Sequence, residues 1–444
     1  MADGGNVGIP CRNHRGFVIG QIATERSGAD LVLLSTALPA PKLAEVVERE
    51  QISILIADEE FAEVIRDGAV TAKVIVADGA GVDSLGVIAA TDRKCTSPRR
   101  RSRLVMLTSG TTGPPKGARR ENRAPGPEAL GMFVTVPYRI GETYLVCPPL
   151  FHAWGLSQAT TALATASTLH LRRHFDVEEV APLLSENTFD VLAVVPMMLR
   201  RFLRVAPSDL AIEAPRMVLS SGNVLSGDLA LEWMDRFGDD LYNFYGSTET
   251  AIGTIGTPAD LRAAPGTVGR PPGGVTIGIL DCESMPVPVG TRGRVHLSSG
   301  MQFAGYTDGS DRERSGTLMA SGDLGYMDEN GRLHVQGRVN DMIVTGGENV
   351  FPSRVEEVIE QFPGVDAVAV FGVKDQDFGK RVVAFVVPVT GVNFDVDAML
   401  EAAANELQTF MVPREVRLVD SLPMTTTGKV VRHKLAVLGE ADRI

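Results

Sequence analysis

Thr108-Ser109-Gly110-Thr111-Thr112-Gly113-Pro114-Pro115-Lys116-Gly117 is the stretch of the 444-residue chain that decides its fold. It combines four hydroxyl side chains, three glycines and one lysine, and it follows a short apolar run at residues 104–107. Glycines let the backbone curl so that N–H groups point at an anion, while the hydroxyls add donors and Lys116 adds a positive charge. Such a loop after a strand predicts a phosphate-binding turn. It is not a Walker loop, because Lys116 is followed by Gly117 and not by Ser or Thr.

Outward from this loop, strand and helix patterns alternate along the chain. Apolar runs of strand length are separated by segments with helical periodicity, which predicts βαβ units and a parallel sheet covered on both faces. The predicted strands are residues 52–57, 73–77, 104–107, 191–195, 217–219 and 241–244, and the predicted helices are residues 43–50, 176–185, 197–204 and 228–237. Residues 266–318 are rich in Gly, Pro and short alternating strands, which indicates a small barrel-like piece.

The chain changes character near residue 339, so we expect a large domain at residues 1–339 and a small mobile domain at residues 340–444. In the small domain, Ser353 and Glu356 have the spacing of a capping box at the start of a helix. The predicted elements of this domain are helices at residues 353–362 and 396–407 and strands at residues 368–371, 382–387 and 415–419. The expected fold class is α/β, with parallel βαβ sheets and the barrel-like piece in the large domain and an α+β small domain.

Composition excludes several classes of protein. The net charge of −12 argues against non-specific nucleic-acid binding, because phosphate backbones require clustered Lys and Arg. The four cysteines form no CxxC pair, so neither a zinc site nor a disulfide framework is indicated. We find no apolar run of spanning length and no basic region followed by an apolar core at the start. We therefore expect no transmembrane segment and a cytoplasmic location.

Further motifs follow the loop in a fixed order. They are Tyr245-Gly246-Ser247-Thr248-Glu249, Ser321-Gly322-Asp323-Leu324-Gly325-Tyr326, Gly337-Arg338-Val339-Asn340-Asp341, Thr345-Gly346-Gly347-Glu348-Asn349 and Thr427-Gly428-Lys429. Together with residues 108–117, they resemble the signatures of the adenylate-forming superfamily, which includes acyl-CoA synthetases, peptide-synthetase adenylation domains and luciferases. The resemblance covers residues 104–435, and residues 344–352 look most like those of bacterial fatty-acid CoA ligases.

The resemblance implies an ATP site assembled from several motifs. Glu249 is expected to bind a Mg²⁺ ion that bridges the phosphates, because carboxylate oxygens are the hard ligands that Mg²⁺ prefers. Thr248 is expected to donate to the α-phosphate, and Asp323 and Arg338 to hold the ribose. Tyr245 is expected to stack on adenine. The other expected ATP-binding residues are Thr108, Ser109, Gly110, Thr111, Thr112, Gly113, Lys116, Ser221, Gly222 and Gly246.

Lys429 is the main catalytic residue that the resemblance implies, together with Thr248 and Glu249. In the family, a lysine on such a loop reaches the reacting α-phosphate and carboxylate. The small domain then rotates between two half-reactions and withdraws this lysine. Asn340 matches the hinge position of that rotation, where Asp or Lys is commoner. Because Asn has the shape of Asp without its charge, the resemblance implies the rotation but not its rate.

A third group of residues is expected near the acyl chain and the incoming thiol. His152 and Trp154 lie in an aromatic segment that is similar to the family's acyl-site segment, and Met197 matches one wall of the acyl pocket. Gly346 and Gly347 are expected to line the path of the pantetheine arm of CoA. Ordinary core packing is an open alternative for His152, Trp154 and Met197.

The predicted reaction is ATP-dependent activation of a carboxylic acid, by resemblance a medium- or long-chain fatty acid, to acyl-AMP, followed by transfer to CoA. Two alternatives stay open: an acyl-AMP ligase that delivers to a carrier protein, and a non-catalytic nucleotide-binding paralogue. Arg200, Arg201 and Arg204 form either a weak membrane-facing patch or, more simply, a solvated helix face. A homodimer also stays open. Family members carry several dozen more residues before this start, so we expect the first layer of the large domain to be missing.

Overall fold

The structure is a computed structural model, and it describes residues 5–81, 83–89, 98, 100–108, 116–121, 126–205, 214–424 and 430–431. The described residues divide into two compact units. The first unit comprises residues up to 276 together with 297–319, and the second comprises residues 277–296 and those from 320 onward. The predicted domain division between residues 339 and 340 stays a prediction.

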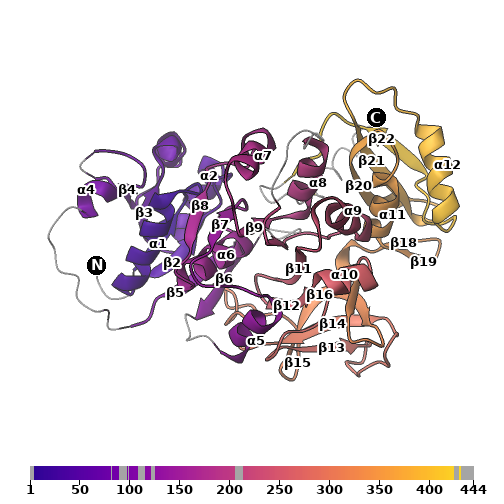
Figure 1. The fold of residues 1–444 in the computed structure, drawn as a ribbon, viewed down its shortest axis with the longest axis horizontal. Coiled ribbons are helices and arrows are strands. Elements are labelled where there is room, and N and C mark those ends of the chain that lie inside the picture. Colours follow the sequence, from indigo (N-terminus) through magenta and orange to yellow (C-terminus); the bar gives the residue numbers. More distant parts are fainter. Residues whose placement is uncertain are drawn as a thin grey trace. The chain divides into compact units, whose positions relative to one another are not determined.

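The first sheet has helices on both of its faces (Figure 1). Its elements are β1 (Asn6–Ile9), α1 (Arg15–Ser27), β2 (Asp30–Leu33), α2 (Ala40–Arg49), β3 (Ile52–Ala57), η1 (Glu59–Phe61), α3 (Ala62–Asp67), β4 (Lys73–Val76), α4 (Leu85–Ala89), β5 (Arg103–Thr108) and β6 (Lys116–Glu121). The strand order is β4-β3-β1-β2-β5-β6. Leu31 and Leu33 pack in the core that contains α1, whereas Val32 and Leu34 pack in the core that contains α2. This alternation places one helix layer on each face, because successive strand residues point to opposite faces.

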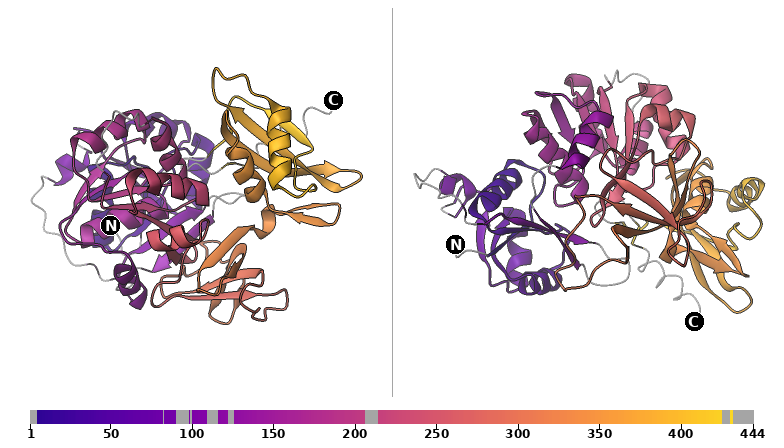
Figure 2. Two further views of the ribbon diagram at one scale, coloured as in Figure 1. Left: turned by 45° about the vertical axis from the view of Figure 1, so that its right-hand side comes forward. Right: turned by 90° about the horizontal axis from the view of Figure 1, so that it is seen from below.

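The second sheet is also largely parallel and belongs to the same unit. Its part of the chain is drawn from purple to pink in Figure 2. Its elements are α5 (Pro127–Thr135), β7 (Thr143–Val146), α6 (Ala153–Ala164), β8 (Thr168–Leu171), α7 (Val177–Glu186), β9 (Val191–Val194), α8 (Pro196–Val205), β10 (Met217–Ser220), α9 (Gly227–Phe237), β11 (Leu241–Ser247), β12 (Ala251–Gly256) and α10 (Pro258–Ala263). The order is β12-β11-β10-β9-β7-β8, and only β12 is antiparallel to its neighbour. The predicted βαβ architecture is therefore confirmed, and the carboxyl ends of β7, β9, β10 and β11 share one edge.

A third sheet covers the region predicted to be barrel-like and extends beyond it. Its strands are β13 (Thr276–Leu280), β14 (Gly293–Ser298), β15 (Arg314–Ser315), β16 (Leu318–Met327) and β17 (Leu333–Arg338). The order is β13-β14-β16-β15, and β17 also pairs with β16. The pairs that involve β15 and β17 are antiparallel, as the short alternating strands of the sequence indicated.

The rest of the second unit has the predicted α+β character. Its elements are η2 (Val339–Asp341), β18 (Ile343–Thr345), β19 (Glu348–Val350), α11 (Pro352–Glu360), β20 (Val365–Asp375), β21 (Gly379–Pro388), α12 (Val396–Glu406) and β22 (Glu415–Leu418). Strands β20, β21 and β22 form a sheet, and β18 and β19 form a separate hairpin. Val355, Val358 and Ile359 of α11 pack in the core beside this sheet, so one face of the helix is buried.

The capping box predicted for α11 is wrong. The residue that caps the helix is Phe351, and no side chain caps the helix N-terminus with a hydrogen bond. The Ser353 hydroxyl instead donates to the carbonyl oxygen of Gln336 at 2.8 Å, and Glu356 Oε1 accepts from the N–H of Val370 at 2.8 Å. Both side chains are thus used for tertiary contacts, because the helix begins one residue before Ser353 and not after it.

Candidate functional site

Lys116 stands at the foot of the predicted phosphate loop. The loop joins β5 to β6, and Thr108 pairs with Lys116 at the end of this antiparallel hairpin that adjoins the loop. Lys116 Nζ lies 3.0 Å from Asp308 Oδ2, 3.0 Å from Ser310 Oγ and 5.3 Å from the ring centroid of Tyr306. Hydrogen bonds from Ser310 and from Lys116 hold the pKa of Asp308 well below its usual range. The half-exposed ammonium group of Lys116 is therefore held in place directly after the loop.

Glu249 lies in a tight turn between β11 and β12 that Ser247 shapes. The Ser247 hydroxyl oxygen accepts hydrogen bonds from the N–H groups of Glu249 at 3.2 Å and Thr250 at 3.1 Å. A Cβ atom on Gly246 would lie 1.9 Å from the carbonyl oxygen of Ala251, so only glycine fits there. Ala251 itself has a φ of 61°. The Tyr-Gly-Ser-Thr-Glu motif thus contains residues that build the turn as well as the carboxylate that the turn presents.

Described residues bond to one carboxylate oxygen of Glu249 and not to the other. Oε1 accepts hydrogen bonds from the Tyr306 hydroxyl at 2.7 Å and from Arg312 Nη2 at 3.0 Å. Burial would raise the pKa of Glu249, but the charge of Arg312 and these two hydrogen bonds outweigh it and hold the pKa below its ordinary value. Within the described part of the chain, no hydrogen bond or ion pair reaches Oε2. An ionised carboxylate with one such oxygen fits a Mg²⁺ ligand.

The carboxyl edge of the second sheet carries most of the remaining residues expected near a ligand. His152 and Trp154 follow β7, Met197 follows β9, and Ser221 and Gly222 follow β10. The loops beyond the carboxyl ends of parallel strands are where open α/β sheets bind their ligands. The structure therefore brings these residues to one edge of the sheet, and their contacts with substrates stay predictions.

Contacts among these residues show how the edge is held together. The Trp154 indole donates from Nε1 to the carbonyl oxygen of Val194 at 2.8 Å, and its ring lies 5.0 Å from that of Phe244. The Ser221 hydroxyl donates to the carbonyl oxygen of Phe244 at 2.7 Å. Gly222 has a φ of 90°, a conformation that favours glycine. Tyr245 follows Phe244 on β11 and is half-buried.

Asp323 and Arg338, the two residues expected to hold a ribose, are direct neighbours in the second unit. They face each other across β16 and β17, and Arg338 Nε lies 2.9 Å from Asp323 Oδ1. Arg338 Nη1 also donates to the carbonyl oxygen of Ser321 at 3.2 Å. The aspartate is almost buried, at 7% exposed. The structure thus brings this predicted pair together.

The glycines expected along the pantetheine path form a hairpin turn. Gly346 and Gly347 join β18 to β19 with φ values of 58° and 88°. A two-residue hairpin turn with positive φ at both positions requires such residues. Their conformation is thus explained without CoA, and their predicted role stays a prediction. Asn340, the expected hinge, lies in the 3-10 turn η2.

Part of the expected site lies outside the described residues. This part consists of Ser109, Gly110, Thr111, Thr112, Gly113 and Lys429, and of Thr108 only the backbone is described. The roles of these residues stay predictions.

Three residues near Glu249 were missed by sequence reasoning. Tyr306 and Arg312 contact its carboxylate, and Arg120 of β6 donates to the carbonyl oxygen of Thr248 at 2.7 Å. The first two lie in an irregular, charged segment with no motif, so local patterns carried no signal for them. Arg120 had a signal: two consecutive arginines in a strand directly after the phosphate loop are unusual for a half-buried sheet position.

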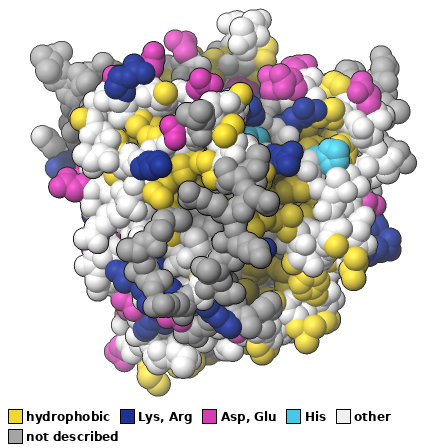
Figure 3. All heavy atoms as spheres, turned by 90° about the vertical axis from the view of Figure 1, so that its left-hand side faces the viewer, with side chains coloured by type: hydrophobic (Ala, Val, Ile, Leu, Met, Phe, Trp, Pro, Cys, Tyr) yellow, Lys and Arg dark blue, Asp and Glu magenta, His cyan; other side chains and the backbone are white. Residues whose placement is uncertain are grey.

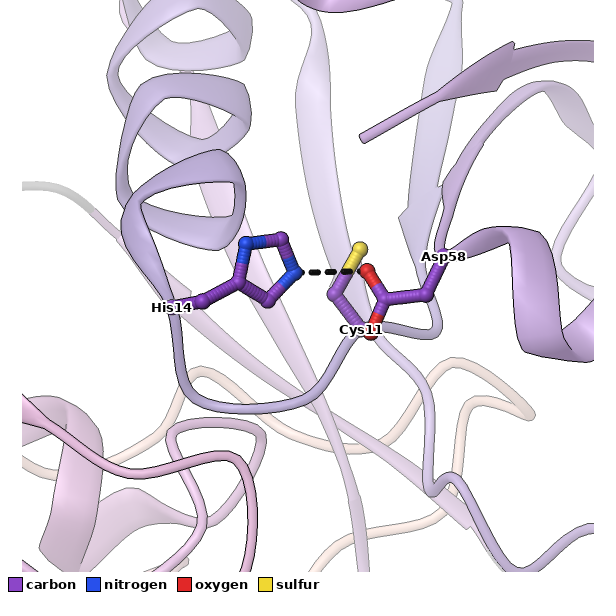
Figure 4. A group of neighbouring side chains, drawn as sticks. All are labelled: Cys11, His14 and Asp58. Atoms are coloured by element: carbon purple, nitrogen blue, oxygen red, sulfur yellow. Dashed lines mark hydrogen bonds and ion pairs between the residues drawn. The ribbon is translucent and has the colours of Figure 1, made fainter. Parts of the chain in front are cut away.

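Cys11, His14 and Asp58 form a separate compact group in the first unit, at the end of β1 (Figure 4). Their potential ligand atoms lie within 4.8 Å of one another, but the buried Asp58 is already satisfied. It accepts hydrogen bonds from His14 Nε2 at 2.6 Å, from the N–H of Arg12 at 2.8 Å and from Arg173 Nη2 at 3.0 Å. Burial raises the pKa of the Cys11 thiol, and the charge of Asp58 raises it further. The guanidinium of Arg173 therefore balances the charge of Asp58. The hydrogen bonds of Asp58 connect the segment after β3 to the segment after β1.

The molecular surface carries both basic and acidic side chains. On the face shown in Figure 3, basic and acidic side chains are interspersed, with apolar side chains between them. Among the described residues, no helix is long and apolar enough to cross a membrane. On α8, Phe202 and Leu203 are buried in the core. The two apolar residues that stand between these arginines therefore face the core, and the membrane-facing and solvated-face interpretations both stay predictions.

Comparison with known proteins identifies matching family models, sequence relatives and a similar solved structure. The family model of AMP-binding enzymes matches residues 1–307, and that of the AMP-binding enzyme C-terminal domain matches residues 354–429. Feruloyl-CoA synthase from Amycolatopsis sp. is 30% identical over 95% of this chain and 86% of that enzyme. Indoleacetate–CoA ligase from Aromatoleum aromaticum is 30% identical over 74% of this chain, which spans 65% of that ligase. ATP-bound MatB from Rhodopseudomonas palustris superposes with a TM-score of 0.85 at 27% identity, covering 99% of this chain and 89% of MatB.

Proposed function

The chain belongs to the AMP-binding enzyme family, and on that basis we propose that it activates a carboxylic acid with ATP and transfers the acyl group to the thiol of CoA. In the first half-reaction the carboxylate attacks the α-phosphorus, which gives acyl-AMP and pyrophosphate. In the second, the thiol attacks the acyl carbonyl and AMP leaves. The protein is then an AMP-forming acid–thiol ligase.

The observation that carries this proposal is the position of Tyr306. Its ring lies 5.3 Å below the ammonium of Lys116, and its hydroxyl lies 2.7 Å from Glu249 Oε1. One side chain therefore joins the cation of the phosphate loop to the carboxylate of the Tyr-Gly-Ser-Thr-Glu motif. A cation for phosphate oxygens beside an ionised carboxylate for a metal ion is the combination that MgATP requires.

In this proposal the first unit holds the triphosphate. Lys116 neutralises phosphate oxygens and Thr248 donates to the α-phosphate, while the loop amides enclose the rest. A Mg²⁺ ion held at Oε2 of Glu249 would offset the charge that builds up on the phosphates. The protein otherwise positions the reactants and stabilises charge, which are the main sources of rate in phosphoryl and adenylyl transfer.

The second unit supplies the ribose and catalytic contacts of the proposal. Asp323 presents a carboxylate of suitable shape for the two ribose hydroxyls, and Arg338 is already oriented against it. Because Arg338 Nε bonds Oδ1, the arginine fixes the carboxylate before the nucleotide arrives. Lys429 is proposed to bridge the α-phosphate and the carboxylate of the substrate during the first half-reaction.

The acid itself is the finer part of the proposal. From the sequence resemblance we propose a medium- or long-chain fatty acid. The second candidate is an aromatic acid, which the names of the feruloyl and indoleacetate relatives favour. The aromatic pair Trp154 and Phe244 at the sheet edge is compatible with either acyl group.

Carboxylate-dependent exchange of labelled pyrophosphate into ATP tests the proposal. The assay is run with saturated fatty acids of increasing chain length and with feruloyl-type and indole acids, with and without Mg²⁺. Exchange with one class above the no-acid background identifies the substrate class. Failure of every acid, with intact ATP binding, would favour a non-catalytic nucleotide-binding protein instead.

The acceptor is tested in a second step. Disappearance of free CoA thiol in the presence of ATP and the best acid supports a CoA ligase. Acyl-AMP that accumulates without CoA consumption supports delivery to a carrier protein.

The proposal has three secondary parts, which are a cytoplasmic location, a homodimer and weak membrane contact through Arg200, Arg201 and Arg204. Light scattering tests the homodimer, and vesicle co-sedimentation tests the membrane contact.

A further inference from the structure

Strand β6 links the phosphate loop to both segments that surround Glu249. Its first residue is Lys116, and two consecutive arginines follow three residues later. Arg119 Nη2 donates to the carbonyl oxygen of Thr307 at 3.1 Å, beside Tyr306. Arg120 donates from Nη2 at 2.7 Å and from Nε at 3.2 Å to the carbonyl oxygen of Thr248. Because successive strand residues point to opposite faces, one arginine reaches each segment.

The contact of Arg120 is with the backbone of the turn that presents Glu249. Its Nη2 also lies 3.4 Å from the carbonyl oxygen of Ser247, so the guanidinium spans two successive peptide groups. A planar guanidinium can hold two acceptors at fixed positions, which a lysine cannot do. The Ser247 and Thr250 hydroxyls shape the turn locally, and the N–H of Phe303 donates to the carbonyl oxygen of Glu249 at 2.8 Å. The Arg120 side chain adds a contact that ties this turn to β6 of the first sheet.

The energetics of this contact indicate a role beyond filling space. Burial removes the guanidinium from water and lowers the pKa of Arg120 to about 10, an effect that the nearby charge of Glu249 partly offsets. The side chain therefore stays charged at neutral pH. Among the described residues, this half-buried guanidinium bonds to neutral carbonyl oxygens. Such a charge costs more free energy in a strand than a hydrophobic side chain would. An arginine at residue 120 therefore indicates a role other than packing.

We propose that Arg120 is a positioning residue for Thr248 and Glu249, which it holds in register with the phosphate loop. This inference rests on the proposed function. Arg120 does not touch the nucleotide in this mechanism. It fixes the Ser247 and Thr248 carbonyl groups, so the carboxylate of Glu249 and the hydroxyl of Thr248 keep their places when ATP phosphates enter beside Lys116. The hairpin of the loop and the metal-binding turn then act as one rigid piece.

The test compares Arg120→Met and Arg120→Lys with a matched control, Arg236→Met. Arg236 of α9 also donates to a backbone carbonyl oxygen, that of Leu203 at 3.0 Å, but this contact joins α9 to α8 and does not involve the turn. Pyrophosphate exchange gives kcat and the KM values for ATP and acid, and calorimetry with a non-hydrolysable ATP analogue gives the affinity without turnover. Thermal melting of each variant reports folding.

We expect Arg120→Met to lower kcat about tenfold to hundredfold and to weaken binding of the analogue severalfold, because displacements of about 1 Å have effects of this size. The KM for the acid should stay within about twofold, and Arg120→Lys should recover only part of the loss. Arg236→Met should keep the kinetics of the unchanged protein. Kinetics of Arg120→Met and Arg120→Lys that equal those of the unchanged protein would overturn the inference.

Two further outcomes are decisive. If Arg120→Met fails to fold, Arg120→Lys decides, since it keeps the charge and loses only the two-carbonyl geometry. A folded lysine variant with normal kcat overturns the inference. If the unchanged protein shows no exchange with any acid, the proposed function fails. The inference then stands or falls on whether analogue binding depends on Arg120.

Discussion

Asp240 gives the clearest pH dependence at the scale of a single residue. It precedes β11, is 8% exposed, and accepts a hydrogen bond on Oδ1 from the Trp233 indole at 3.1 Å, while Oδ2 has no partner within the described chain. Burial raises the pKa of Asp240 to about 7. The unfolded chain would have a pKa of about 3.9. The folded state therefore binds an extra proton between about pH 4 and pH 7, and stability from this group is lost as the pH rises through 7.

We expect Asp240→Asn to remove this part of the pH profile. The amide oxygen can still accept from Trp233, but the side chain cannot ionise. Relative to Asp240→Asn, the unchanged protein should lose on the order of 2–4 kcal/mol of unfolding free energy between pH 5 and pH 8. Urea unfolding followed by tryptophan fluorescence measures it, because both tryptophans lie in the first unit. Parallel profiles for the two proteins would contradict the assignment.

Lys429→Ala tests the proposed catalytic lysine. A cation about 4 Å from an oxyanion contributes roughly 4 kcal/mol at an effective dielectric of about 20. Its removal should slow acyl-AMP formation about a thousandfold. Thioester formation from supplied acyl-AMP should be nearly normal, because the lysine acts only in the first half-reaction. Pyrophosphate exchange and thioester release measure the two steps, and equal loss of both would sink this role.

At the scale of elements, α11 carries a prediction that follows from the corrected roles of its side chains. The carboxylate of Glu356 accepts from the N–H of Val370 on β20 at 2.8 Å. Its loss removes the hydrogen bond that this buried strand N–H makes to the carboxylate, at a cost of about 1–3 kcal/mol. Glu356→Ala should therefore speed amide hydrogen exchange around Val370 about tenfold. Glu357→Ala is the matched control, since Glu357 makes a surface ion pair with Arg354 at 2.8 Å. Faster exchange confined to the first turn of α11 would instead restore the capping-box interpretation.

The elements also show which features the sequence could predict. Strand and helix positions around residues 52–57 and 191–244 were predictable because they depend on local periodicity. Asp323 and Arg338 were recognisable by motif, and the antiparallel pairing of β16 and β17 places them together. The partners of Glu249 were not predictable. Arg312 lies far along the chain in a segment without periodicity, and only the tertiary fold brings it there.

At the scale of the whole molecule, the proposed two-step reaction requires a hinge, and Asn340 is the residue to test. It lies in the 3-10 turn η2, and residues of 3-10 turns generally have φ values near the value that proline enforces. Asn340→Pro should therefore be compatible with the described conformation and should restrict any other. Asn340→Ala removes the side chain but keeps the backbone freedom, which makes it the matched control.

The two variants should separate the half-reactions. If the described conformation serves acyl-AMP formation, Asn340→Pro keeps pyrophosphate exchange near normal and slows thioester formation from supplied acyl-AMP at least about tenfold, because rotation is then the restricted step. If it serves thioester formation, the losses are reversed. Asn340→Ala should keep both rates within about threefold. Asn340→Pro with both half-reactions unchanged would show that the backbone at residue 340 does not move during the cycle, and the hinge would then lie elsewhere.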